Sequence, residues 1–239
     1  MGTALTSFSE YDKAFGKLLN ARRAAWKSIR CTCSIRSSSR SCSIQIRASA
    51  ETLFLLAGED NGGREEFGAK YYTFHGIARI KRASRSGEND PFPAWGKTLE
   101  KISAFCAAYG VAPCLENVEW AVYNRPGVFR ALAKYFPSLS GVLDVKQARI
   151  SAYPYEMYLN EMAGHLAHVH VSDVNGQGRI CLPGKGVFDF PELLKRLDGA
   201  GFTGPLLIEV YKDDFREESE LKRSCEFLHE LLYKYSFGG

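Results

Sequence analysis

Long apolar runs are missing from this 239-residue chain, and no run approaches the roughly 18 residues that a membrane-spanning helix needs. The start, MGTALTSFSEYDK, also lacks the basic and apolar blocks of a signal peptide, so we expect no secretory leader. The chain is 45% apolar and 24% charged, which is typical of a globular protein with one sizeable core. These features argue against a secreted, membrane or disordered protein, and we expect no membrane partner.

Acidic residues are absent between Lys13 and Ala50, where nine Lys or Arg occur. Outside that segment 22 basic residues stand against 27 acidic ones, a net charge of −5 compared with +4 for the whole chain. The net negative charge of these residues repels a polyanion, so we expect no nucleic-acid partner.

The seven cysteines are scattered and odd in number. Cys31 and Cys33 have one residue between them, whereas zinc knuckles and redox pairs have two or more. Free thiols in a reducing compartment are the interpretation that we favour, and the predicted location is the cytoplasm.

From about residue 68 onward, short β-type runs alternate with segments of helical periodicity. The predicted strands are Ala69–His75, Ala112–Glu116, Gly141–Asp144, Ala167–Val171 and Pro205–Val210. Between them apolar residues recur three and four apart, as at Leu99, Ile102 and Phe105, which is typical of helices that cover a sheet. This alternation predicts parallel strands joined by helical crossovers.

The chain before residue 68 is less regular. We expect a helix over Tyr11–Trp26 and three early strands, at Ala4–Phe8, Lys27–Ser34 and Ser41–Ala48. Together with the five later strands these make eight, the number in a (β/α)8 TIM barrel. We therefore predict an α/β fold with one TIM-barrel domain over residues 1–239, whose N-terminal third is irregular or incomplete.

Residues 31–64 are atypical within this pattern. Cys31–Ala50 holds seven Ser, three Cys and three Arg, and a glycine-rich stretch interrupts the following helical segment. Two explanations stay open: a surface loop insertion, or a segment that is not the native reading of its gene, for instance a local frameshift.

The last inward-facing position of each clear strand is a polar residue, at the end where a TIM barrel binds its ligands. These residues are His75, Glu116, Asp144, His170 and Glu209. A charge adds no stability to the end of an apolar strand, because an unpaired buried ion costs several kcal/mol. One such residue could be a solvated strand cap, but a set of five in register favours a functional site.

A bound cation would explain why these polar residues occur together at the strand ends. Three carboxylates and a neutral imidazole that converge on one point repel each other unless a positive ion lies between them. The oxygen-rich donors favour Mn²⁺, with Mg²⁺ or Co²⁺ as alternatives, and they are also compatible with Zn²⁺.

Six segments, taken in order, carry a family resemblance. The strings are YYTFHG, PCLENVE, GVLDVKQA, HVHVSD, LPGKGVFDF and GPLLIEVY. They resemble the signature segments of the xylose isomerase-like TIM barrels, over roughly residues 65–235. That superfamily includes the sugar phosphate isomerases/epimerases, the D-tagatose/D-psicose 3-epimerases and the class II apurinic endonucleases. The resemblance implies a divalent-metal-dependent isomerase or epimerase of carbohydrate metabolism, which moves a proton next to a carbonyl through an enediolate.

The resemblance also implies roles for single residues. The implied metal ligands are Glu116, Asp144, His170 and Glu209. Glu116 and Glu209 would in addition be the catalytic residues, which carry the proton on opposite faces of the substrate. The implied substrate-binding residues are His75, Gln147 and Arg179. The expected partner is a small sugar or polyol, and a homo-oligomer is left open.

The chain departs from the family pattern in two places. Asp144-Val145-Lys146-Gln147 stands where the superfamily has Asp-x-x-His, and a glutamine is a poor metal ligand but a good hydrogen-bond partner for a hydroxyl. Gly178-Arg179-Ile180 lacks the Asp-x-His pair of the apurinic endonucleases, so a trinuclear zinc site is incomplete. An apurinic endonuclease-like phosphodiesterase and a catalytically degenerate barrel stay open as alternatives, which metal content would distinguish.

Overall fold

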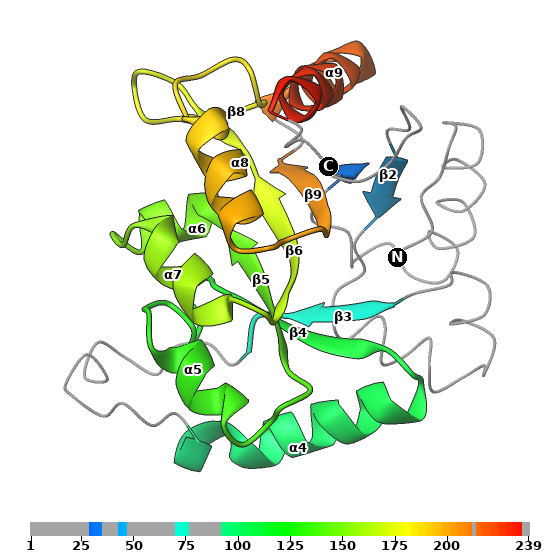
Figure 1. The fold of residues 1–239 in the computed structure, drawn as a ribbon, viewed down its shortest axis with the longest axis vertical. Coiled ribbons are helices and arrows are strands. Elements are labelled where there is room, and N and C mark those ends of the chain that lie inside the picture. Colours follow the sequence, from blue (N-terminus) through cyan, green and yellow to red (C-terminus); the bar gives the residue numbers. More distant parts are fainter. Residues whose placement is uncertain (1–28, 35–42, 47–69, 77–91, 212–213, 236–239) are drawn as a thin grey trace. The chain divides into compact units, whose positions relative to one another are not determined.

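A computed structural model of the chain describes residues 29–34, 43–46, 70–76, 92–211 and 214–235 (Figure 1). The chain forms two compact units. We call Lys70–His170 the central unit, and we call Val171–Gly239 with the described parts of Met1–Ala69 the terminal unit.

The central unit is built on parallel strands that neighbour one another in chain order. β3 (Tyr71–Phe74) pairs with β4 (Ala112–Glu116), β4 with β5 (Ser140–Asp144), and β5 with β6 (Leu166–Val171). Every predicted strand of this region is therefore present, with ends that differ by at most two residues. Sequential parallel strands of this kind form part of a barrel wall, as the alternating pattern predicts.

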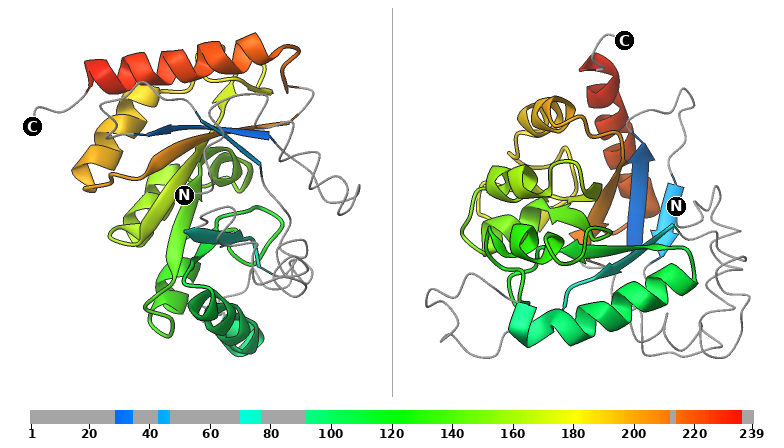
Figure 2. Two further views of the ribbon diagram at one scale, coloured as in Figure 1. Left: turned by 90° about the vertical axis from the view of Figure 1, so that its right-hand side faces the viewer. Right: turned by 60° about the horizontal axis from the view of Figure 1, so that its bottom comes forward.

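Helices connect these strands and lie on one side of them (Figures 1 and 2). They are α4 (Phe92–Ala108), α5 (Val128–Ala133), α6 (Val145–Ile150) and α7 (Tyr155–Met162). Their apolar faces supply much of the core, since Leu99, Phe129, Leu132, Tyr158 and Met162 are fully buried. Of the helical stripe that the sequence predicts in α4, Leu99 is fully buried, whereas Ile102 and Phe105 are partly buried.

The terminal unit has an antiparallel sheet, with β1 (Ile29–Ser34) between β2 (Ser43–Ile46) and β9 (Pro205–Val210). The strands expected at Lys27–Ser34 and Ser41–Ala48 are present, but the prediction that they join a parallel barrel is wrong. The reason lies in the connection: residues 35–42 are eight residues, and a parallel crossover needs about a dozen or more. The expected strand Ala4–Phe8, the helix over Tyr11–Trp26 and most of residues 31–64 lie outside the described residues.

Two helices complete the terminal unit, next to the short hairpin of β7 (Asp173–Val174) and β8 (Ile180–Cys181). α8 (Phe190–Gly199) begins where the Asp189 carboxylate accepts a hydrogen bond from the Glu192 N–H. α9 (Glu218–Lys234) begins with a capping box and packs beside α8 (Figure 1). Its apolar stripe is buried: Leu221, Cys225, Leu228 and Leu232. No helix in the described parts of the chain is long and apolar enough to cross a membrane.

The cysteines of α4, β4, β8 and α9 are in two states. Cys106, Cys114 and Cys181 are free thiols, as expected. Burial raises the pKa of Cys106 to about 11, which keeps that thiol protonated and unreactive. Cys225 is disulfide-bonded, so the expectation that every thiol is free does not hold for this residue.

Candidate metal centre

Three predicted ligands meet at the strand ends of the central unit. Glu116 ends β4, Asp144 ends β5, and His170 pairs with Asp144 in the register of β5 and β6. Each side chain offers one ligand atom, and these atoms lie within 4.8 Å of one another. The three residues are 1–2% exposed, so the cluster is enclosed by protein. Parallel pairing brings the strand ends together, which is why residues far apart in the sequence converge.

The spacing within the cluster fits a six-coordinate ion. Nδ1 of His170 lies 2.9 Å from Oε1 of Glu116 and 3.9 Å from Oδ2 of Asp144. Around an octahedral ion with ligand distances of about 2.1 Å, adjacent ligand atoms lie about 3.0 Å apart and opposite ones about 4.2 Å apart. Two carboxylates and one imidazole are suitable donors for Mn²⁺, Mg²⁺ or Zn²⁺. The two separations from His170 lie close to this range, and the donor chemistry fits a divalent cation.

Asp144 is held in place by its neighbours. Its Oδ1 accepts a hydrogen bond from the Gln147 N–H at 2.8 Å and thereby caps α6, which begins directly after β5. The buried side chain of Asn117 bonds to both backbone groups of Asp144, at 2.9 Å to the carbonyl and 2.8 Å from the N–H. The capping bond takes one carboxylate oxygen, and the other, Oδ2, faces His170.

His75 lies at the edge of the same cluster. Its Nε2 is 3.2 Å from Oε2 of Glu116, and its side chain is 28% exposed. The ring of Trp120, which is 47% exposed, packs edge-on against the His75 imidazole with 5.3 Å between centroids. Glu116 thus contacts one buried imidazole, that of His170, and one partly exposed imidazole, that of His75.

Gln147 contacts the loop that follows β4. Its Oε1 accepts a hydrogen bond from the Glu119 N–H at 3.1 Å. Because that oxygen is already used, the group it can offer to a substrate is its amide NH₂. Its predicted role in substrate binding stays a prediction.

Two residues near the ligands were missed by the sequence interpretation. Asn117 directly follows Glu116 in PCLENVE, and its buried amide ties the end of β4 to the end of β5. Lys146 is only 5% exposed, and its Nζ lies 3.9 Å from Oδ2 of Asp144. The sequence carries no signal for the burial of Lys146, since a lysine two residues after a predicted ligand is ordinarily exposed to solvent.

His168 is part of the core of the central unit. It is 5% exposed, and its Nε2 lies 3.3 Å from the hydroxyl of Thr73. The ring of Tyr71 packs beside it with 5.8 Å between centroids. These contacts identify His168 as a structural histidine.

Glu161 fixes the loop between β4 and α5. Its carboxylate accepts hydrogen bonds from the Tyr123 hydroxyl at 2.6 Å and from the Gly127 N–H at 2.7 Å. Burial raises the pKa of Glu161, while these hydrogen bonds act in the opposite direction. The loop carries Glu119 and Trp120, so Glu161 stabilises the segment that borders the cluster.

The remaining two predicted residues belong to the terminal unit. Arg179 is exposed in the turn between β7 and β8, where its N–H donates to Oδ1 of Asn175 at 3.0 Å. Glu209 is the second-last residue of β9 and is 8% exposed. A role in substrate binding for Arg179, and in metal binding and catalysis for Glu209, stays a prediction.

Asp173 organises the glycine loop of the terminal unit. Its buried carboxylate accepts hydrogen bonds from four backbone N–H groups, those of Val174, Gly184, Gly186 and Phe188, at 2.7–3.0 Å. A Cβ on Gly186 would lie 2.3 Å from the Val174 carbonyl oxygen, so only glycine allows this approach.

The same loop is attached to α9. The Ser224 hydroxyl donates to the Pro183 carbonyl at 2.9 Å, and Lys185 forms an ion pair with Glu220. The bond from Lys185 lowers the pKa of Glu220 to about 2. The loop therefore has a defined conformation, and Lys185 already has a carboxylate partner.

We expect Asp173→Ala to destabilise the protein by about 3 kcal/mol, because buried N–H groups lose an ionised acceptor. For a chain of this length, that loss corresponds to a fall in Tm of about 6–12 °C. Thermal unfolding measures the effect, with Asp198→Ala on the exposed face of α8 as the control. A Tm within 1–2 °C of the wild type, roughly the control range, would contradict this role.

Comparison with known proteins identifies the family. Residues 65–231 match the xylose isomerase-like TIM barrel family, and the chain belongs to that family. The fold and family that the sequence predicted are therefore confirmed.

The individual curated relatives share little sequence identity with this chain. The chain is 25% identical over 147 residues to the fructoselysine 3-epimerase of Escherichia coli O157:H7, across 56% of this chain and 52% of that protein. The chain thus spans about half the length of the curated relatives it matches.

Solved structures support the fold alone. A D-tagatose 3-epimerase-like protein superposes with a TM-score of 0.57 at 20% identity, over 73% of this chain and 66% of that one. The IOLI protein with a bound zinc atom gives a TM-score of 0.62 at 16% identity, over 79% of this chain and 71% of that one.

Proposed function

We propose that this protein is a divalent-metal-dependent isomerase or epimerase that acts on a sugar, sugar phosphate or polyol. The observation that carries the proposal is the enclosed cluster of Glu116, Asp144 and His170, with ligand atoms within 4.8 Å of one another. Membership of the xylose isomerase-like family and the similarity to a sugar-derivative 3-epimerase support the reaction class. Residues 1–239 would form one domain in this enzyme.

In this proposal Glu209 completes the ligand set. Glu116, Asp144, His170 and Glu209 would hold the cation, for which we expect Mn²⁺ first. When bound, the cation stabilises the negative charge that develops on the oxygens of an enediolate. One structural relative holds zinc, which supports a metal-binding role for this fold.

The side chains supply the proton chemistry. Glu116 accepts the proton from the carbon next to the carbonyl, while His75 holds its carboxylate in orientation. Glu209 returns a proton to the opposite face or to the neighbouring carbon. His75, the Gln147 amide and Arg179 donate hydrogen bonds to substrate hydroxyls or to a phosphate.

Dependence on the metal tests the proposal. Treatment with EDTA should abolish deuterium exchange at the carbon next to the carbonyl in a panel of ketoses, and one equivalent of Mn²⁺ per chain should restore it. NMR follows the exchange, and elemental analysis counts the metal. Equal exchange with and without metal would contradict the proposal, as would failure of the protein to bind any divalent ion.

A further inference from the structure

Lys146 places a positive charge beside the candidate ligands. Its side chain is 4% exposed, and its Nζ lies 3.9 Å from Oδ2 of Asp144. Oδ2 is the same oxygen that faces Nδ1 of His170 at 3.9 Å. A lysine is almost never buried to this extent unless a carboxylate compensates its charge. The ammonium group is therefore an integral part of this cluster.

The same ammonium group opposes a divalent cation. An ion bound to Oδ2 at about 2.1 Å would lie at most about 6 Å from Nζ, because Nζ is 3.9 Å from that oxygen. At this separation, in an enclosed site, two positive charges repel each other strongly. Without metal, however, the ammonium group offsets part of the repulsion between the carboxylates of Glu116 and Asp144.

We propose that Lys146 balances the charge of the cluster, so that the metal-free protein stays folded and the divalent ion binds more weakly than the carboxylates alone would allow. This inference rests on the proposed metal centre. Lys146 acts through Asp144 and the bound ion, and it is a positioning residue without a proton-transfer role. Its consequence is a metal that exchanges readily with solution.

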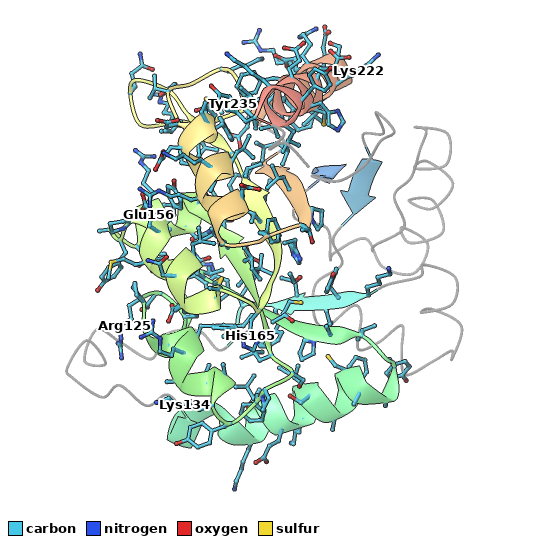
Figure 3. The ribbon with its side chains drawn as sticks, in the orientation of Figure 1. Arg125, Lys134, Glu156, His165, Lys222 and Tyr235 are labelled. Atoms are coloured by element: carbon cyan, nitrogen blue, oxygen red, sulfur yellow. The ribbon has the colours of Figure 1, made fainter. Side chains whose placement is uncertain are left out.

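Isothermal titration of the metal-free protein with MnCl₂ tests the inference. Lys146→Met keeps the length of the side chain and removes its charge, so its Kd for Mn²⁺ should fall by about tenfold or more. Lys146→Arg keeps the charge, so its Kd should stay closer to that of wild type than the Kd of Lys146→Met does. The control is Lys134→Met, which makes the same charge change at the exposed end of α5, where Figure 3 labels Lys134.

A second measurement separates charge from packing. The metal-free Lys146→Met protein should have a lower Tm than wild type, and Mn²⁺ should raise its Tm more than it raises that of wild type. If the variant folds only in the presence of Mn²⁺, that result supports the inference. Failure of both Lys146→Met and Lys146→Gln to fold even with Mn²⁺ would overturn it.

The outcomes also distinguish this inference from the proposed function. If wild type binds Mn²⁺ and Lys146→Met binds it with an unchanged or higher Kd, charge balancing by Lys146 is wrong and the metal centre stands. If neither protein binds Mn²⁺, both ideas are wrong. If only Lys146→Met binds, the inference is supported and the wild-type enzyme does not use Mn²⁺.

Discussion

Glu116→Gln is expected to lower solvent-proton exchange at the carbon next to the carbonyl by about 10³-fold or more while the protein stays folded. The amide is nearly isosteric with the carboxylate, but it cannot accept a proton at neutral pH. Glu116 is also the side chain that both His75 and His170 contact, at 3.2 and 2.9 Å. An amide NH₂ in place of one oxygen would face one of these imidazoles, so metal affinity should fall as well.

The measurement is deuterium wash-in followed by NMR, with circular dichroism to confirm the fold. Gln147→Ala is the matched control, because this residue lies beside the cluster and has no assigned proton transfer. In that variant KM should rise and exchange at saturating substrate should persist. Exchange in Glu116→Gln at the wild-type rate would exclude Glu116 as the base.

The cluster in the central unit could be predicted from the sequence because two simple regularities determine it. Apolar runs of strand length ended in polar residues, and the helical stretches between them required parallel pairing. Parallel pairing places all these ends at one edge of the sheet, so Glu116, Asp144 and His170 had to lie close together. No knowledge of loop conformation was needed for that step.

The contacts that hold the cluster could not be predicted, because they depend on backbone geometry. The pairing of Asn117 with the backbone of Asp144 requires the register of β4 and β5. The burial of Lys146 depends on where α6 begins, and that is set by the Asp144 cap. The hydrogen bonds of Asp173 could not be predicted either, since its four partners are backbone N–H groups that carry no signature in the sequence.

The prediction missed the antiparallel pairing of β1 for a different reason. Strand propensity located β1 and β2 correctly, but counting strands up to eight assumed that each one joins the barrel. The short connection between β1 and β2 was visible in the sequence and already favoured a hairpin. Loop length was therefore better evidence for the topology of this segment than the number of strands.

Glu209→Gln is expected to produce the second large loss, again about 10²-fold or more in exchange, with a folded protein. Glu209 is a carboxylate, 8% exposed, near the end of the apolar strand PLLIEV, where a charge has no stabilising role of its own. As the proposed fourth ligand and second proton carrier, it should also contribute to metal affinity.

Metal affinity and solvent-proton exchange, measured separately, distinguish the ligand role of Glu209 from its proton-transfer role. Under saturating Mn²⁺ the variant should still fail to return a proton, because the amide can coordinate weakly through its oxygen but cannot transfer a proton. Glu226→Gln, on the exposed face of α9, makes the same change in charge and should leave both metal affinity and exchange unchanged. If exchange is normal in Glu209→Gln as well as in Glu116→Gln, the two-carboxylate mechanism is wrong, and membership of the family then reflects the fold alone.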